Sequence, residues 1–316
     1  MPSPFTVPGN WYRGALHVHT TESDGSMLPE RVLTHYQMGG WDFVALTDHE
    51  KITDRSAASR PDFLVLPGTE VAAGTAELGQ RYHIVGIGAE GEVKLPHGRT
   101  AQDAIDWIGQ AGGVAIIAHP YWSGLTVADL LALRGYAAIE VFNTGCEGEI
   151  ARGLSSVHWD ELLTRGLEVR AVAADDSHWP GFDSLIAWTM VRATDLTRDS
   201  VLDALREGRF YASNGPEIRD VVVDLATGRI EVECSPAVAI SLVASPTLGG
   251  RVGVGRHEPP VLARRRRGPQ NWEGLDEGGS LTGATFYLRG QETYARVQVV
   301  DARGRTAWTN SLFIRE

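Results

Sequence analysis

The residues best suited to chemistry lie near the amino terminus, where two histidines alternate with apolar residues. His17 and His19 close a strand-like segment, 12–19, and Asp24 follows in the next few residues. Successive strand side chains point to opposite faces, so the two imidazoles are expected to share one face. Imidazole nitrogen and carboxylate oxygen bind divalent metals. The stretch therefore predicts a metal site, although two histidines on one face are also common as hydrogen-bonded core residues.

The same pattern, an apolar run that ends in His, Asp or Glu, recurs along the chain. Six of the ten histidines lie at the ends of predicted strands. Six imidazoles and three carboxylates exceed the three or four ligands of one catalytic zinc ion. The set therefore predicts two or three ions, with a carboxylate such as Glu70 as a bridge. The predicted ligands are His17, His19, Asp24, His49, Glu70, His83, His119, Asp176 and His178.

Composition narrows the class of protein. The 316 residues are 43% hydrophobic and 22% charged, which is typical of a globular protein with one large or two ordinary domains. The net charge of -11 argues against a nucleic-acid or anionic-membrane surface. Residues 1–212 carry 16 Lys and Arg against 28 Asp and Glu, whereas 213–316 carry 13 against 12. The acidic excess thus coincides with the histidine clusters, and it fits either a cation site or an acidic solubilising surface.

Cysteine usage and the amino terminus bear on location. Cys146 and Cys234 are far apart, and two cysteines make neither a disulfide scaffold nor a thiolate metal site. The first eleven residues lack the basic and apolar regions of a signal peptide, and no run approaches 18 apolar residues. We therefore expect a cytoplasmic protein that does not span a membrane.

Strands and helices alternate over the first two-thirds of the chain. Apolar runs at 43–47, 63–68 and 114–118 are separated by amphipathic segments such as 29–38, which begins with Pro29 at a favoured helix-start position. Helices are also expected at 101–112, 126–134 with Thr126 as N-cap, 147–165 and 199–207. This alternation predicts parallel strands with crossover helices. Polar residues at six or more strand ends favour a (β/α) barrel over a doubly wound open sheet.

The pattern changes after residue 212. Short stretches of alternating polarity, separated by Gly, Pro and Asn, fill 213–316 and predict a small antiparallel β-sandwich. The run Arg264–Arg267 lies among Gly and Pro, which favours a mobile loop over an anion-binding patch. His257, like His35 and His97, is assigned no role. The boundaries predicted are thus 1–212 for the barrel and 213–316 for the β-domain.

The order of these motifs resembles the PHP (polymerase and histidinol phosphatase) metallohydrolases, most closely the metal-dependent phosphoesterase and CehA/McbA-like branch. The resemblance covers about residues 11–212 and rests on 16–20 with 23–25, 47–49, 67–70, 118–120 and 176–178. It implies a distorted (β/α)7, TIM-like barrel with two or three manganese, iron or zinc ions. It also implies three ligand sets, which are His17, His19, Glu70 and Asp176; Glu70, His83 and His119; and Asp24, His49 and His178.

The metals suggest the mechanism and the roles of neighbouring residues. Water bridging two divalent ions has a pKa near neutrality and serves as the hydroxide nucleophile. His178 or Asp176 is the expected proton carrier, and Asp48 and Asp175, next to ligands, are expected to orient imidazoles. Weaker candidates for substrate contact flank the ligand loops or offer a bidentate phosphate partner. These are Tyr121, Trp122, Asn143, Arg152, His158, Ser177, Trp179 and Arg192.

Three functions fit the sequence. The leading one is hydrolysis of a small phosphomonoester or phosphodiester by a metal-dependent enzyme. The second is hydrolysis of a carboxylic ester or carbamate of the CehA type, because a hydroxide attacks a carbonyl as well. The third is a metal-stabilised binding module without turnover. The expected partner is a small ester, with no membrane and no nucleic acid beyond small nucleotides, and the sequence does not fix the oligomeric state.

Overall fold

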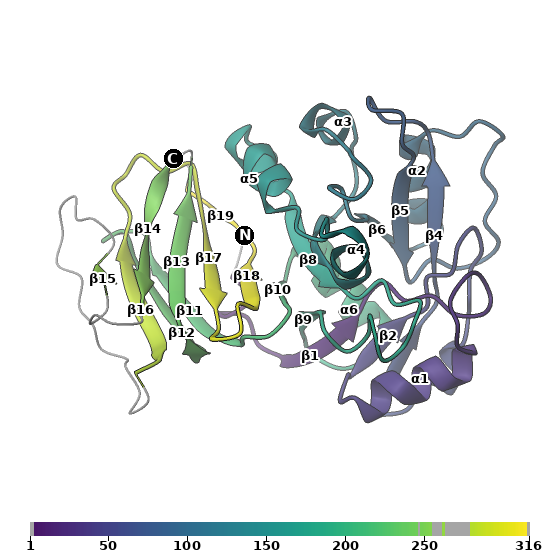
Figure 1. Ribbon diagram of the computed structural model, residues 1–316, viewed down its shortest axis with the longest axis horizontal. Coiled ribbons are helices and arrows are strands. Elements are labelled where there is room, and N and C mark those ends of the chain that lie inside the picture. The colour runs from purple at the N-terminus through teal and green to yellow at the C-terminus, as the bar shows by residue number, and fades with distance from the viewer. Residues whose placement is uncertain (1–2, 246, 255–260, 263–278, 315–316) are drawn as a thin grey trace. The chain divides into compact units, whose positions relative to one another are not determined.

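The chain folds into two compact units in the computed structural model, which describes residues 3–245, 247–254, 261–262 and 279–314 (Figure 1). The arginine run at 264–267 and His257 lie outside these residues. We call the first the α/β unit and the second the β unit. The α/β unit comprises Pro8–Leu162 and Val169–Ala212, and the β unit comprises Met1–Val7, Leu163–Glu168 and Ser213–Glu316. Within the described residues, every helix is too short or too polar to cross a membrane.

The α/β unit carries the long alternation of strands and helices. In chain order its elements are β1 (Asn10–Ala15), α1 (Pro29–Met38), β2 (Phe43–Ala45), the 3₁₀ turn η1 (Ser56–Ala58), β3 (Leu64–Leu66), β4 (Gly68–Ala73), β5 (Tyr82–Ile87), α2 (Ala101–Gln110), β6 (Val114–Ile117), α3 (Val127–Leu131), β7 (Ala138–Asn143), α4 (Thr144–Ile150), α5 (Ser156–Thr164), β8 (Arg170–Ala174), β9 (Trp188–Ala193), α6 (Arg198–Glu207) and β10 (Phe210–Ser213).

Two sheets form this unit. In the first, β1, β2 and β3 are parallel and β9 runs antiparallel to β1. In the second, the order is β4-β5-β6-β7-β8, with antiparallel pairing from β4 to β6 and parallel pairing from β6 to β8. The predicted mixture of strands and helices is confirmed, but a closed TIM-like barrel is not, because the sheets remain separate. Isolated parallel bridges, Val18 with Ser177 and His49 with Glu70, join them where the ligands lie.

Two expected elements differ from prediction for local reasons. Pro67 separates β3 from β4, so Glu70 lies inside β4 rather than after a strand, and a hairpin without a helix leads to β5. The long helix expected at 147–165 is instead α4 and α5. Ala151 takes the left-handed conformation at φ 58°, which ends α4 because that conformation cannot continue a right-handed helix.

The core of the α/β unit contains separate buried hydrophobic clusters, and alternate residues of one strand belong to different clusters. Along β2, Phe43 and Ala45 belong to one buried cluster, whereas Val44 packs in another with Tyr36 and Trp41. This alternation follows from the period of two along a strand. Helix starts follow their local signals, because Pro29 opens α1 and the predicted N-cap of α3, Thr126, forms a reciprocal capping box.

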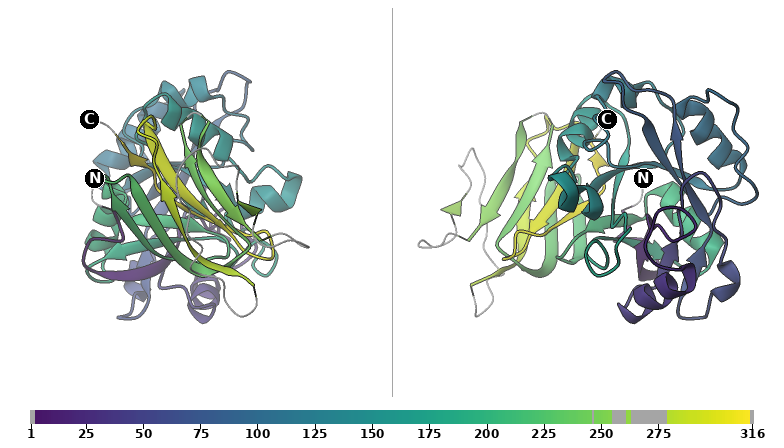
Figure 2. Two further views of the ribbon diagram at one scale, coloured as in Figure 1. Left: turned by 90° about the vertical axis from the view of Figure 1, so that its left-hand side faces the viewer. Right: turned by 45° about the vertical axis from the view of Figure 1, so that its right-hand side comes forward.

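The β unit contains the antiparallel strands that the alternating stretches predict (Figure 2). One sheet has the order β11-β12-β16, and β12 and β16 contact β13, β14 and β17 of the other sheet. The strands are β11 (Ile218–Asp224), β12 (Arg229–Ala237), β13 (Ala239–Ala244), β14 (Leu248–Gly253), β15 (Val261–Leu262), β16 (Leu281–Tyr287), β17 (Tyr294–Val300), β18 (Thr306–Thr309) and β19 (Leu312–Phe313).

Candidate metal centre

The nine predicted ligand residues converge in the α/β unit. They come from segments following β1, β2, β6 and β8 and from β4 and β5 themselves. Their donor atoms form overlapping groups in which every atom lies within 4.8 Å of the others. The groups are His17, His19, Glu70 and Asp176; Glu70, His83 and His119; and His19, Asp24, His49 and His178.

The first group is buried and closely spaced. Nε2 of His17 lies 3.1 Å from Nε2 of His19 and 3.2 Å from Oδ1 of Asp176. Nε2 of His19 lies 3.2 Å from both Oδ1 of Asp176 and Oε2 of Glu70. Ligands about 2.0–2.1 Å from a tetrahedral metal are roughly 3.3 Å from one another. These four donor atoms therefore have the mutual spacing that a single divalent ion imposes.

An orphaned oxygen supports the same interpretation. Oδ1 of Asp176 is buried and has no hydrogen-bond partner among the described residues. Leaving a buried carboxylate oxygen unpaired is costly. The residues present thus fit a metal ion, whose charge and coordination would satisfy this oxygen and the facing imidazole nitrogens together.

Glu70 connects the first two groups. Its Oε2 lies 3.3 Å from Nε2 of His17, whereas its Oε1 lies 2.8 Å from Nδ1 of His83 and 3.3 Å from Nε2 of His119. The carboxylate is fully buried in the middle of β4, and antiparallel β5 places His83 beside it. Each oxygen therefore faces a different set of imidazoles, which is the arrangement of a carboxylate bridging two ions.

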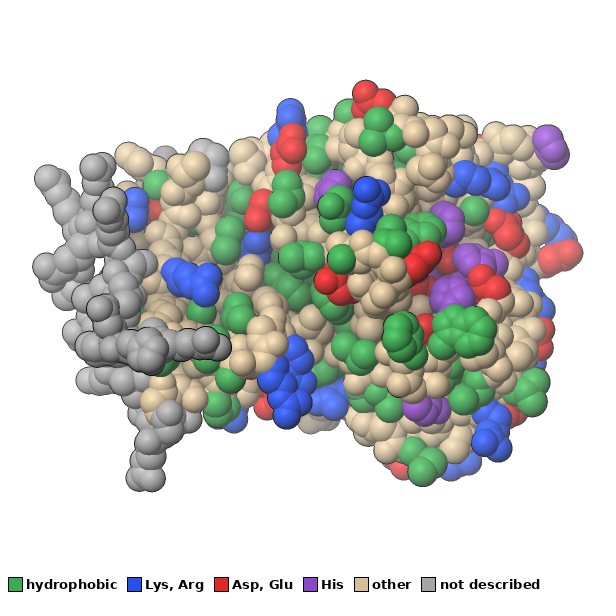
Figure 3. Space-filling view, in the orientation of Figure 1, with side chains coloured by type: hydrophobic (Ala, Val, Ile, Leu, Met, Phe, Trp, Pro, Cys, Tyr) green, Lys and Arg blue, Asp and Glu red, His purple; other side chains and the backbone are tan. Residues whose placement is uncertain are grey.

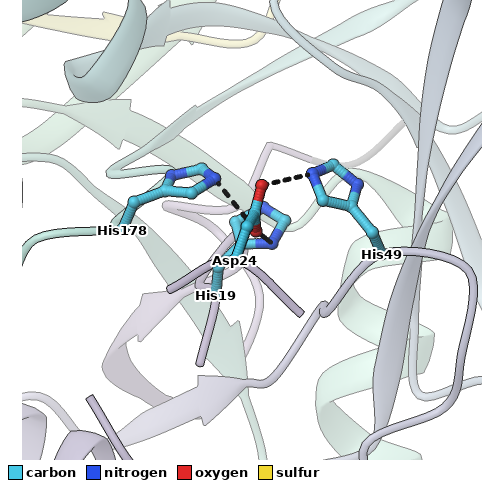
Figure 4. Close-up of side chains that lie close together, drawn as sticks. All are labelled: His19, Asp24, His49 and His178. Atoms are coloured by element: carbon cyan, nitrogen blue, oxygen red, sulfur yellow. Dashed lines mark ion pairs between the residues drawn. The ribbon is translucent and has the colours of Figure 1, made fainter. Parts of the chain in front are cut away.

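The third group is more open to solvent. Asp24 lies between the rings of His49 and His178 (Figure 4), with Oδ2 3.3 Å from His49 Nε2 and Oδ1 3.4 Å from His178 Nε2. The side chains of Asp24, His49 and His178 are 53%, 30% and 27% exposed, whereas those of the first group are buried. His178 Nδ1 donates to the carbonyl oxygen of Asp176 (2.9 Å), which leaves Nε2 facing Asp24. An ion held here would exchange with solvent more readily than one in the first group.

Glu140, which was not among the predicted site residues, orients the buried ligands. It lies in β7 and is 1% exposed. His17 Nδ1 donates to its Oε1 (2.8 Å), while the backbone N–H of His119 and the amide of Asn143 donate to its Oε2 (2.8 Å each). Because the proton of His17 is fixed on Nδ1, its Nε2 lone pair faces the other ligands. An acidic residue inside an apolar strand run was the available signal.

The two carboxylates expected to orient imidazoles instead organise backbone. Asp48 accepts hydrogen bonds from the N–H and hydroxyl of Thr20 (2.7 and 2.9 Å). Asp175 accepts from the hydroxyl of Tyr36 (2.9 Å) and from the N–H groups of residues 185–187. Burial raises the pKa of Asp175 to about 6, against the opposing effect of these donors. Both side chains fix the loops that carry ligands, and among the described contacts neither accepts from an imidazole.

The cluster perturbs protonation strongly. Burial lowers the pKa of His19, but hydrogen bonds and charge from Asp176 and Glu70 outweigh it and raise that pKa to about 9. Burial likewise opposes a rise at His17, whose pKa the surrounding carboxylates hold well above its usual value. The pKa of Glu70 is well below its usual range, because the imidazoles outweigh its burial. In the metal-free protein, buried imidazoles therefore carry protons that a metal ion would displace.

Two ligand residues have unusual backbone conformations. His119 has φ 25° and Asp176 has φ 53°, in the left-handed region that non-glycine residues rarely adopt. Gly145 in α4 permits close approach here, because a Cβ at this position would lie 2.8 Å from the carbonyl oxygen of Asp176. Strain of this kind collects at functional sites, where surrounding contacts enforce it. The backbone is therefore shaped to aim these two side chains.

Seven of the nine predicted ligands, all except His17 and His19, line a cavity of about 480 Å³ in the α/β unit. Trp122, Trp179 and Phe182 also line it, together with Glu149 and Cys146. In the space-filling view, histidines, acids and large hydrophobic side chains gather on the same part of the surface (Figure 3). Phe182, Glu149 and Cys146 were not predicted, because nothing in their local sequence distinguishes them. Cys146 Sγ is 3.9 Å from Oδ2 of Asp176, in a further group with His119.

Four predicted substrate contacts have other surroundings. Asn143 is buried, and its amide nitrogen donates to Glu140 and, at 3.1 Å, to Asp176. The guanidinium of Arg152 lies over the ring of Tyr121, and that of Arg192 lies over Trp11. Nε2 of His158 donates to the carbonyl oxygen of Leu125 (3.0 Å). Of the four, the structure brings Asn143 to the cluster, and none lines the cavity.

Part of the chain is similar to a known phosphodiesterase. No protein-family model matches the chain. Over 79 residues, 24% of the chain, it is 39% identical to the phosphoribosyl 1,2-cyclic phosphate 1,2-diphosphodiesterase of Eggerthella lenta. The match spans 30% of that relative's length.

A solved structure of a two-domain protein shares the fold. A two-domain protein from Bacteroides vulgatus, containing predicted PHP-like metal-dependent phosphoesterase, aligns with a TM-score of 0.53 over 98% of both chains at 15% identity. An amidohydrolase from Chromobacterium violaceum with bound sulfate covers 62% of this chain and 96% of its own, at 20% identity and a TM-score of 0.45, which is too low to carry an argument. The resemblance to PHP-type proteins is confirmed at the level of the fold, and the curated relative is a phosphodiesterase.

Proposed function

We propose that this protein is a metal-dependent phosphoesterase acting on a small phosphomonoester or phosphodiester. The observation that carries the proposal is the unpartnered, buried Oδ1 of Asp176, 3.2 Å from Nε2 of both His17 and His19. A bound divalent ion would coordinate all three atoms at once. Similarity to a diphosphodiesterase and to a two-domain phosphoesterase-like protein supports phosphoester substrates.

The residues would hold two or three ions of manganese, iron or zinc. The buried first group would hold one ion, and Glu70 would extend to a second held by His83 and His119. The open group around Asp24 would hold the third. Nitrogen and oxygen donors of this kind suit all three metals.

The proposed chemistry divides between ions and protein. Such ions, when bound, supply a water of lowered pKa and neutralise charge on substrate oxygens. Glu70 would keep two ions adjacent through its two oxygens. His178 lines the cavity and is partly exposed, so in a protein without an ion in the open group its ring would pass a proton to the leaving oxygen, with Asp176 as the alternative carrier. Glu140 would keep the Nε2 of His17 unprotonated.

We also propose a domain assignment. Residues 1–212 would form the catalytic domain, an open variant of the distorted (β/α)7 barrel, and 213–316 would form a separate β-domain. The isolated bridges between Val18 and Ser177 and between His49 and Glu70 support this, because they join the two sheets beside the ligands.

A second candidate, hydrolysis of a carboxylic ester or carbamate, is favoured by one observation. None of the residues lining the cavity, all within the described part of the chain, is Lys or Arg. Phosphate sites commonly provide such a cation. An uncharged ester would need none.

The test is hydrolysis by protein loaded with manganese, iron or zinc. p-Nitrophenyl phosphate, bis-p-nitrophenyl phosphate and p-nitrophenyl acetate separate the candidate reactions. We expect phosphoester turnover, and its near-complete loss in His17→Ala and Asp176→Ala with folding retained. His97→Ala, an exposed histidine outside the cluster, is the matched control. Acetate turnover alone would favour the second candidate, and a metal-loaded protein inert to all three esters would favour a binding module.

A further inference from the structure

The mouth of the cavity is built from aromatic side chains that belong to no ligand group. The ring of Trp122 lies 5.0 Å from that of His119 and 6.1 Å from that of His83, edge to face. Trp179 directly follows the ligand His178, and Phe182 closes the same loop. Trp122 thus contacts the second ligand group, and Trp179 adjoins the third group through its chain neighbour His178.

Two of these aromatic side chains are unusually exposed. Trp179 is 62% exposed and Phe182 is 69% exposed, although both line the cavity. A Cβ on Gly148 of α4 would lie 3.4 Å from the Phe182 ring, so the ring rests against that helix. Covering large, water-exposed aromatic surfaces beside a site makes ligand binding more favourable. Planar aromatic groups match such surfaces best.

The loop carrying these residues is held in place rather than free. Both oxygens of Asp183 accept from the backbone N–H of Trp179 (3.0 and 2.9 Å), and one accepts from the N–H of His178 (2.8 Å). The hydroxyl of Ser177 donates to the same carboxylate (2.9 Å). Asp183 is therefore occupied in positioning Trp179 next to the ligand His178.

The charge of the cavity restricts the substrate further. Its described lining contains no Lys or Arg. The lining carboxylates belong to the ligand groups or, as Asp183, fix this loop, with one exception, Glu149. The indole N–H of Trp122 donates to Glu149 (2.9 Å), which holds a negative charge at the aromatic mouth. A dianionic monoester carries one more negative charge than a diester and would meet Glu149 without a side-chain cation to balance it.

We infer that the substrate is an aryl phosphodiester, a monoanion whose aromatic group lies against Trp122, Trp179 and Phe182. The inference rests on the proposed phosphoesterase function and narrows its substrate class. Hydrolysis would add the oxygen of water to phosphorus and break one ester P–O bond. The alcohol or phenol would leave with one proton, and the second proton of water would be released from the phosphate product.

Direct binding tests this inference independently of turnover. Isothermal titration calorimetry of the metal-loaded protein would compare diphenyl phosphate with diethyl phosphate, two monoanions that differ in aromatic character. We expect diphenyl phosphate to bind at least about tenfold more tightly, from stacking on more than one ring. Trp179→Ala and Phe182→Ala should each reduce that ratio severalfold with unchanged metal content. Met38→Ala, an exposed apolar residue on α1, should leave it unchanged.

The charge of the site is tested with phenyl phosphate, the dianionic monoester. Glu149→Gln should tighten its binding several-fold while changing diphenyl phosphate less. Equal binding of diethyl and diphenyl phosphate, or ratios unaltered in the Trp179 and Phe182 variants, would overturn the inference. Selective binding of diphenyl phosphate by a protein that hydrolyses no phosphoester would instead support recognition of an aromatic monoanion by these side chains and refute the proposed function, and with it the role of the diester as substrate.

Discussion

Replacing Glu140 with Gln tests how the protein prepares its metal ligands. The wild-type carboxylate accepts three hydrogen bonds, from His17 Nδ1 on one oxygen and from His119 N–H and Asn143 on the other. Gln has one acceptor oxygen and one NH₂ group, so it cannot satisfy both sides. With its oxygen toward His119 and Asn143 it keeps two of the three bonds, and its NH₂ then faces His17 Nδ1.

That orientation reverses the tautomer of His17. Nδ1 would accept from the new amide, and the proton would move to Nε2, which faces His19, Glu70 and Asp176. A protonated nitrogen cannot bind a metal. Loss of a hydrogen-bond partner of a ligand typically costs 10–100-fold in metal affinity. We expect about 100-fold for Glu140→Gln, roughly 2.7 kcal/mol, because a ligand is lost as well as misoriented.

The assay is competition with a chelator of known affinity, with elemental analysis at saturation. Glu92→Gln, on an exposed residue, is the matched control. Thermal unfolding without metal should be recorded beside it, since a buried mismatch also costs stability. Glu140→Gln protein that binds the tightest ion as strongly as wild type would refute the orienting role of Glu140.

Three further predictions follow from the site. The pKa of His19 in the metal-free protein is raised to about 9, so protons compete with metal for this ligand below that pH. Chelator competition should therefore show the metal affinity rising from pH 6.5 to about 9 and then levelling. The same proton stabilises the metal-free fold fully below about pH 6.5, the usual value, and this contribution should disappear toward pH 9 in denaturant titrations. Gly145→Ala places a Cβ 2.8 Å from the carbonyl oxygen of Asp176, so urea titration should show a loss of about 1–3 kcal/mol and metal analysis a lower content. Gly40→Ala has open space around the new Cβ but a left-handed backbone at φ 83°, so it should lose stability without losing metal.

Strand ends explain why the ligand cluster could be anticipated from sequence. His17, His19 and His119 follow apolar runs directly, and the family resemblance placed the remaining ligands in the same order. Glu70 was predicted to follow a strand but lies inside β4, because the break at Pro67 divides what reads as one apolar run into two strands. Its carboxylate nevertheless lies beside the histidines predicted to share its groups. Residue type and order were sufficient here, since the ligands are local to their motifs.

Other parts of the site depend on contacts between distant segments. Glu140 meets His17 across 123 residues, and no local pattern distinguishes it from any acid in a strand. The left-handed backbone at Ala151 ends α4 without a Gly or Pro at that position. Trp122 and Phe182 lie 60 residues apart, so a shared cavity follows only from the fold. Closure of the sheets likewise depends on pairing, and β4 to β6 pair antiparallel where crossover helices were expected.

Anomalous diffraction from a crystal grown with manganese tests the central claim most directly. We predict at least two ions, one of them bonded to Nε2 of His17 and His19, Oε2 of Glu70 and Oδ1 of Asp176 at roughly 2.0–2.3 Å. Density without an ion between these four atoms, in a crystal soaked at saturating manganese near pH 8, would contradict it.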